Sequence, residues 1–209
     1  MWGLALLGLA TGKEEAFGTF ERSLNVATQY TRLKCLREDS CGNNLEIKDK
    51  VSEYSLSTAF DVSTASYVQV FSVLAQEANP MGITFNNDGT KMFVVGVQGD
   101  DVNEYTLSTG FDVSTASFVG SFSVSSQERF PYGLAFNTDG TKMFMLGTSG
   151  DDVNEYTLST GFDVSTASFV DSKDISSQDS NPTGLAFNQD GTKMFVAGNA
   201  GDDINEYTL

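Results

Sequence analysis

Residues 85–96 read FNNDGTKMFVVG, and nearly the same sequence returns as FNTDGTKMFMLG at 136–147 and as FNQDGTKMFVAG at 187–198. The three copies begin 51 residues apart, and the only three prolines of the chain keep the same spacing. A fixed period of this length is the signature of a repeat architecture. One short sequence therefore encodes most of the molecule.

The repeats define the expected domain organisation. We place an N-terminal segment at residues 1–50 and the repeat region at 51–209. The stretch VNEYTLSTGFDVSTASFV at 102–119 recurs letter for letter at 153–170, so the copies have diverged little. The repeat region divides into copies at 51–101, 102–152 and 153–203 and a partial copy at 204–209.

Each copy has the pattern of four short strands. The runs GLAF and KMFMLG are joined by a turn, 137–140, in which aspartate can hydrogen-bond its own backbone and glycine supplies a positive φ. The runs NEYTL and SFVGSFSV follow, rich in β-branched and aromatic residues. Four antiparallel strands in about 50 residues match one blade of a β-propeller. We therefore predict an all-β fold.

The N-terminal segment shows a different period. Between residues 12 and 41 apolar residues recur at steps of three or four, which predicts a short amphipathic helix that caps the repeats or docks to a partner. The opening run MWGLALLGLATG lacks the basic residues of a signal peptide and is not a convincing one. Cys35 and Cys41, the only cysteines, form a small disulfide or remain two thiols. The apolar residues at helical spacing are Phe17, Phe20, Leu24, Ala27, Tyr30 and Leu33.

Two segments carry a resemblance to a known group. PTGLAFNQDGTKMFVAG at 182–198 and DDVNEYTLST at 151–160 resemble the repeats of the lactonase and YncE-like β-propellers. The resemblance covers 51–209 and implies a propeller. Similar repeats occur in large secreted bacterial proteins and in tail or surface proteins of marine phages, which implies a virion or extracellular location.

The residue types present restrict the chemistry. The chain contains no histidine, so it cannot form a catalytic triad with a histidine base or a zinc site with histidine ligands. The histidines expected of active members of the resembling group are absent. We therefore predict a non-enzymatic structural or recognition module, such as a phage particle component or an extracellular binding protein. The alternative is a propeller hydrolase or lyase of the lactonase type that uses Ca²⁺ or Mg²⁺.

The charge distribution indicates which partners to expect. Residues 1–50 contain seven basic and seven acidic residues, so the entire net charge of −16 lies in the repeat region. Such a surface repels nucleic-acid phosphates, and no apolar run approaches the roughly 20 residues of a membrane span. We expect neither a nucleic-acid partner nor a membrane span.

The copies differ mainly in two loops, the one before each proline and the one before each Gly-Asp-Asp. Both loops should emerge on one face of the ring, where variation is typical of a contact surface for a protein or glycan, although surface loops also drift without constraint. The paired aspartates of this face either ligate Ca²⁺ or end loops; no other cofactor is expected. The candidate contact residues are Asn79, Met81, Arg129, Phe130, Tyr132, Asn181 and Thr183. The candidate metal ligands are Asp100, Asp101, Asp151, Asp152, Asp202 and Asp203.

Three copies are too few to close a ring, since propellers usually have four to eight blades. The last copy lacks a fourth strand, whereas residues 66–73 form a fourth strand without a preceding blade. We expect a homo-oligomer in which this strand completes the last blade of a neighbouring subunit, giving six blades from two chains. The competing explanation is that the sequence is a fragment of a larger propeller.

Overall fold

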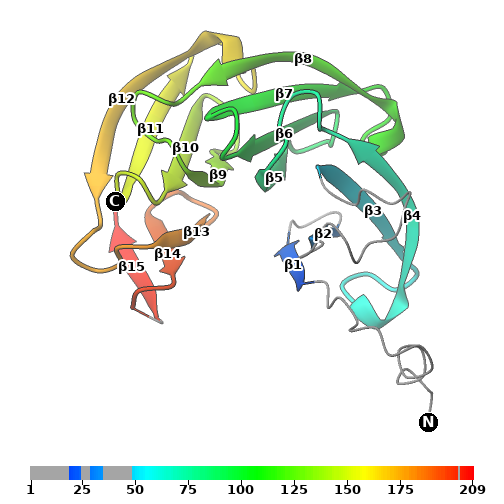
Figure 1. Ribbon diagram of the computed structural model, residues 1–209, viewed down its shortest axis with the longest axis horizontal. Coiled ribbons are helices and arrows are strands. Elements are labelled where there is room, and N and C mark those ends of the chain that lie inside the picture. The colour runs from blue at the N-terminus through cyan, green and yellow to red at the C-terminus, as the bar shows by residue number, and fades with distance from the viewer. Residues whose placement is uncertain (1–18, 25–28, 35–48, 202) are drawn as a thin grey trace, which may run out of the picture.

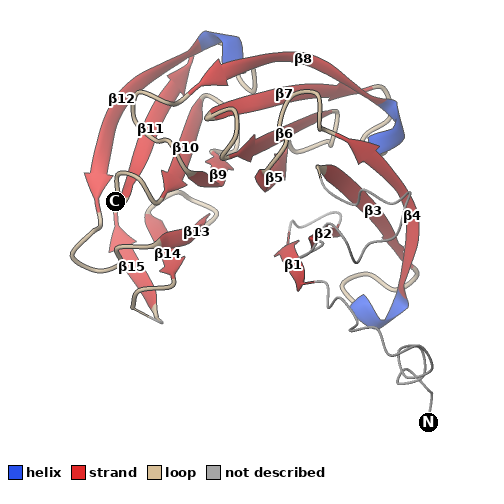
Figure 2. Cartoon of the chain, viewed as in Figure 1, coloured by secondary structure: helices blue, strands red, loops and turns tan. Residues whose placement is uncertain are grey.

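The computed structural model describes residues 19–24, 29–34, 49–201 and 203–209 of the chain. Regular structure in this part consists of β-strands and three short 3-10 helices (Figure 2). The strands are β1 (Thr19–Leu24), β2 (Gln29–Lys34), β3 (Lys50–Leu56), β4 (Ala65–Ser72), β5 (Pro80–Phe85), β6 (Lys91–Gly96), β7 (Asp101–Leu107), β8 (Ala116–Ser123), β9 (Pro131–Phe136), β10 (Lys142–Gly147), β11 (Asp152–Leu158), β12 (Ala167–Asp174), β13 (Pro182–Phe187), β14 (Lys193–Gly198) and β15 (Ile204–Thr208). The 3-10 helices are η1 (Val62–Thr64), η2 (Val113–Thr115) and η3 (Val164–Thr166).

The strands form four antiparallel sheets, which we call blades 1 to 4. Blade 1 has the strand order β1-β2-β3-β4, blade 2 β5-β6-β7-β8, blade 3 β9-β10-β11-β12 and blade 4 β13-β14-β15. Figure 1 shows the blades as an open arc, with β1, β5, β9 and β13 toward the inside and β4, β8 and β12 along the outside. The four-stranded repeat predicted from the sequence is confirmed.

The constant turn between the first two strands of a blade explains the repeated NxDGT sequence. In blade 2, Asp88 Oδ1 accepts hydrogen bonds from the backbone N–H of Thr90 at 3.0 Å and from its hydroxyl at 2.6 Å. Gly89 has a φ of 72°, a left-handed conformation that glycine adopts without steric cost. The turn therefore needs no ligand to account for its sequence.

The cores lie between neighbouring blades. Met143 and Met145 of blade 3 pack in one cluster with Val102 of blade 2, and Val153 of blade 3 packs in another with Met194 of blade 4. Each of these side chains is at most 4% exposed. Apolar burial of this kind is the main stabilising term between sheets. Each blade is thus held largely by the next one along the chain.

The predicted N-terminal helix is wrong. Residues 19–24 and 29–34 form β1 and β2, which pair with each other and, through β2, with β3. Some of the apolar spacing fits both structures, because a step of four residues, as between Phe20 and Leu24, also matches the period of two in a strand. Pairing between β1 and β2 satisfies the strand alternative, and β2 joins this hairpin to β3 at Gln29 and Tyr30. Cys35 and Cys41 lie outside the described residues.

The predicted strand exchange is also wrong as stated. The strand expected to be without a blade is β4, and it pairs along its length with β3 of the same chain, from Lys50↔Ser72 to Leu56↔Ala65. The arc therefore contains four blades, of which the last has three strands in the described residues.

A membrane-spanning helix is not found in the part of the chain that the structure describes.

Candidate ligand-binding loop face

One end of the blades carries both variable loops, and a buried carboxylate joins them. Glu77, which is fully buried, lies in the loop between β4 and β5. Its carboxylate accepts the backbone N–H of Asn79 at 2.6 Å in its own loop. It also accepts the N–H groups of Gln98 at 3.2 Å and Gly99 at 3.1 Å in the loop between β6 and β7. Glu77 is therefore a brace that fixes two loops against each other.

The same brace recurs in blade 3 and is incomplete in blade 4. Glu128 accepts the N–H groups of Phe130 at 2.6 Å, Ser149 at 3.0 Å and Gly150 at 3.3 Å. Asp179 occupies the same place and accepts the Asn181 N–H at 2.7 Å. Its Oδ2 atom is buried and has no hydrogen-bond partner among the described residues. The missing methylene explains this difference, because the shorter aspartate side chain does not reach the second loop.

A glycine makes room for each brace. A Cβ atom on Gly96 would collide with the carboxyl group of Glu77, and one on Gly147 would collide with that of Glu128. Gly198 stands in the same relation to Asp179. These glycines are the last residues of β6, β10 and β14. Their position follows from the need to pack a carboxylate directly against the backbone.

The loop tips beside the braces differ between blades. Arg129 and Phe130 are both exposed, and half of the Phe130 surface faces solvent. The preceding loop has the half-buried Asn79 at the position of Phe130, and the following loop has the exposed Asn181. The second residues of the inner strands, Met81, Tyr132 and Thr183, are half-buried. All seven predicted contact residues thus lie in these loops or at the strand starts beside them, on one face of the arc, and Arg129 and Phe130 are the most prominent.

The paired aspartates of this face make hydrogen bonds within their own blades, but the buried Oδ1 of Asp151 has no hydrogen-bond partner among the described residues. Asp100 and Asp151 adopt φ values of 49° and 50°, and their carbonyl oxygens accept the N–H groups at the ends of β8 and β12. The second aspartate of each pair accepts a hydrogen bond from an asparagine two residues later; the acceptors are Asp101, Asp152 and Asp203. Burial raises the pKa of Asp101 and of Asp152. Asp202 lies outside the described residues.

These aspartates do not gather into one centre. The described residues contain no group of three or more acidic side chains placed to hold a metal ion. The aspartates instead end a loop and begin a strand, as their hydrogen bonds show. A calcium site on this face stays a prediction.

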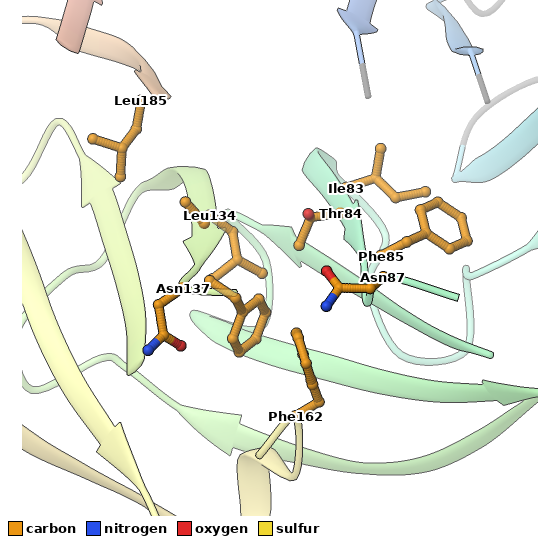
Figure 3. Close-up of a pocket in the computed structure, with 10 residues that line it drawn as sticks. Ile83, Thr84, Phe85, Asn87, Leu134, Asn137, Phe162 and Leu185 are labelled. Carbon is orange, nitrogen blue, oxygen red and sulfur yellow. The ribbon is translucent and has the colours of Figure 1, made fainter. Parts of the chain in front are cut away.

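A pocket of about 280 Å³ lies at the other end of the inner strands (Figure 3). Phe85 and Phe136 end β5 and β9 on its walls, and Leu185 of β13 contributes from blade 4. Asn87, Asn137 and Thr84 provide polar groups, and none of the ten lining side chains is ionisable. The predicted contact residues are not among them, so the loop face and the pocket are separate features.

Sequence reasoning missed both the braces and the pocket. Glu77, Glu128 and Asp179 repeat at the period of 51 residues, three positions before each proline, so the signal was present in the printed sequence. The pocket has no such signal, because it is formed by side chains from three different blades.

Comparisons with known proteins identify the fold. No family model matches the chain, and no curated protein matches it. Similar solved structures include a Bacteroides fragilis protein described as "a putative 6-phosphogluconolactonase", with 13% identity and a TM-score of 0.56, covering 91% of this chain and 51% of that one. The β-propeller domain of Cps50 (Swd1) from Myceliophteria thermophila has 10% identity and a TM-score of 0.51, covering 87% and 47%. A luciferin-regenerating enzyme has 18% identity and a TM-score of 0.54, covering 88% and 54%.

These neighbours correct the prediction that the chain is not an enzyme, because structures of the same fold carry enzyme names. The missing histidines on which that prediction rested exclude particular chemistries and do not exclude catalysis on this fold. The chain spans about half the length of the solved structures it matches. At these identities the comparisons show the architecture alone: the chain is an arc of β-propeller blades.

Proposed function

We propose that this chain is a recognition module that binds a partner protein through the loop face, with Arg129 and Phe130 as the main contacts. The proposal rests on one observation: the loops of successive blades are held by the same contacts, but the residues that they expose differ. Glu77 and Glu128 hold the loops by the same hydrogen bonds, whereas the two residues after each brace differ. A rigid scaffold that presents differing loop residues is the usual arrangement of a binding surface.

The chemistry of the tips indicates the kind of partner. Arginine and aromatic residues are the types most enriched at energetic centres of protein interfaces. Phe130 exposes half of its surface beside the exposed Arg129, and its backbone N–H is fixed by Glu128. The net charge of −16 would steer a partner with a basic surface toward the chain. We further propose, from the sequence resemblance, that the partner is met outside the cell or on a virion.

The test is an affinity capture in which the wild type and two matched variants are immobilised and the proteins that each retains are compared. Phe130→Ala removes the exposed ring, and Asn181→Ala makes the same truncation at the equivalent position of the next loop. We expect one protein from the native source to be retained by the wild type and by Asn181→Ala and lost with Phe130→Ala or Arg129→Ala. Equal retention by all variants would refute the assignment of the loop face.

A second candidate function is an enzyme that uses the pocket at the inner strands. It is favoured by the pocket itself and by neighbours named as enzymes. The pocket exposes mainly polar atoms and has no ionisable lining side chain, which suits an uncharged polar part of a substrate. A group for proton transfer would have to come from outside the ten lining residues.

Hydrolysis of 6-phosphogluconolactone tests this candidate. Ala135 of β9 also lines the pocket, so Ala135→Leu should narrow it. Turnover above the spontaneous rate that falls in Ala135→Leu would support this candidate. No turnover, or turnover unchanged by Ala135→Leu, would count against it, while the binding result for Phe130→Ala would stand independently.

A further inference from the structure

The pocket at the inner strands coincides with a difference between the blades. The inner strands of blades 2, 3 and 4 read PMGITF, PYGLAF and PTGLAF, so each ends in glycine, an aliphatic residue, a small residue and phenylalanine. The small residue is Ala135 in blade 3 and Ala186 in blade 4, but it is Thr84 in blade 2. Thr84 and Ala135 both line the pocket. The difference between the blades thus places a hydroxyl group in the pocket.

The turn that follows the inner strand differs between the blades as well. Asn87, Thr138 and Gln189 occupy the equivalent position before the aspartate of each turn, and among them Asn87 lines the pocket. Asn87 Nδ2 donates to the Thr138 carbonyl oxygen of blade 3 at 2.7 Å, which fixes the direction of the amide. The amide oxygen of Asn87 and the hydroxyl of Thr84 form no hydrogen bond with another described residue. Figure 3 shows both groups turned toward the side on which Leu134 lies.

The charges around the pocket exclude several classes of ligand. None of the ten lining side chains is ionisable. Lys91 Nζ contacts the carbonyl oxygen of the lining residue Phe162, but this lysine is paired with Glu104 at 2.7 Å. A phosphate or carboxylate would therefore meet no unpaired cation in the lining, and the net charge of −16 repels anions further. An ammonium group would equally meet no lining carboxylate. The ligand should therefore be uncharged.

The polarity and size of the pocket indicate a ligand with several hydroxyl groups. The pocket exposes mainly polar atoms, and a purely apolar ligand would bury them without hydrogen bonds. A hydroxyl group both donates and accepts, so the hydroxyls of a sugar can satisfy the Thr84 hydroxyl and the Asn87 amide oxygen together. The volume of about 280 Å³ lies near the lower limit of about 300 Å³ for ligand pockets, which suits one ring.

We propose that this pocket binds one neutral sugar ring through the Thr84 hydroxyl and the Asn87 amide oxygen. The ring is a free monosaccharide or the end residue of a glycan, since both present the same hydroxyl groups. Phe136 and Phe162, whose ring centroids lie 5.4 Å apart, form part of the wall beside it. The site is separate from the loop face and needs no group for proton transfer, so it rests on neither proposed function.

Saturation-transfer difference NMR on the whole chain tests the proposal. The probes are the methyl glycosides of glucose, galactose, mannose and N-acetylglucosamine, each at up to about 20 mM, because a few neutral hydrogen bonds should give a Kd on the order of 1 mM. We expect at least one probe to bind, and its 6-phosphate to bind at least roughly tenfold more weakly. No binding by any of the four would overturn the proposal, as would a phosphate that binds equally well.

An oligosaccharide that ends in the sugar that binds distinguishes the two sources of the ring. Tighter binding of the oligosaccharide than of the methyl glycoside supports the end of a glycan as the ligand. Equal or weaker binding supports the free monosaccharide.

Variants that copy other blades place the sugar in the pocket. Thr84→Ala introduces the residue of blades 3 and 4, and Asn87→Thr introduces the residue of blade 3, so both should fold. Each should weaken binding roughly two- to tenfold. Thr106→Ala is the matched control, because Thr106 is an exposed threonine of β7 in the same blade and does not line the pocket. This variant should bind as the wild type does.

Equal binding by Thr84→Ala and Thr106→Ala would overturn the assignment of the sugar to this pocket. Sugar binding that falls in Thr84→Ala, without hydrolysis of 6-phosphogluconolactone, would support the proposal and reject the enzyme candidate.

Discussion

Replacing Asp179 with glutamate should stabilise the protein. The native aspartate holds its own loop through the Asn181 N–H and leaves Oδ2 buried without a hydrogen-bond partner among the described residues. In blades 2 and 3 a glutamate at this place also reaches the second loop. The added methylene should place the carboxylate beside the N–H groups of Ala200 and Gly201, which correspond to Ser149 and Gly150.

The expected size of the gain follows from these contacts. A hydrogen bond to a charged group contributes about 1.5–3 kcal/mol, and an unsatisfied buried acceptor costs about 1–3 kcal/mol. Ordering the exposed loop of residues 199–201 opposes part of this gain, at roughly 1 kcal/mol or more for each residue fixed. We expect a net increase of about 1–2 kcal/mol in the free energy of unfolding. For a chain of this length that corresponds to a melting temperature higher by roughly 2–8 °C.

Urea unfolding followed by far-ultraviolet circular dichroism measures the change in the free energy of unfolding. Glu128→Asp is the reciprocal variant, since it creates in blade 3 the defect that blade 4 already has. It should lower the free energy of unfolding by about 1–3 kcal/mol. If Asp179→Glu is neutral or destabilising while Glu128→Asp is tolerated, the carboxylates do not act as braces and the reasoning fails.

Two further predictions concern charged groups in the blades. Lys91 Nζ donates to Glu104 of its own blade and to the Phe162 carbonyl oxygen of blade 3. Lys91→Met should lower the free energy of unfolding by about 3–5 kcal/mol, because it leaves the nearly buried Glu104 without its cation. Lys142→Met in blade 3 removes an exposed pair and should cost less than about 1 kcal/mol. Urea unfolding compares the two variants, and equal costs would contradict the contact of Lys91 between blades. The second prediction concerns pH. Burial raises the pKa of Asp101 above its ordinary value of 3.8, so the folded state binds this proton more tightly than the unfolded chain does. The protonated carboxyl therefore favours the folded state at low pH. This contribution is lost as the pH rises through the folded-state pKa. Asp101→Asn should therefore have a higher melting temperature than the wild type at pH 7, and the same melting temperature at the lowest pH at which both remain folded. A lower melting temperature for the variant at pH 7 would contradict the sign of this effect.

The repeat and its turns could be predicted from the sequence because their causes are local. The NxDGT turn satisfies its own hydrogen bonds within five residues, and the runs on either side alternate as strands do. The period of 51 residues then places every copy without further information. Met143 and Tyr156 lie on strands of the repeat and are fully buried.

The rest depends on contacts between distant parts of the chain. The spacing of Phe20 and Leu24 is compatible with a helix and a strand. The strand is formed by pairing of β1 with β2, which in turn pairs with β3 more than twenty residues away. The brace formed by Glu128 joins loops about twenty residues apart, and the pocket draws on three blades. Repetition revealed which residues recur, but not that an acidic residue before a loop tip would be buried.

Amide hydrogen exchange at two equivalent valines tests the central claim, that neighbouring blades are joined by one contact, in which a glutamate of one blade accepts the first N–H of the next blade's 3-10 helix. The N–H groups of Val113 and Val164 are bonded to glutamates of the preceding blades and should exchange slowly. Rapid exchange at Val113 and Val164 would contradict this contact between neighbouring blades.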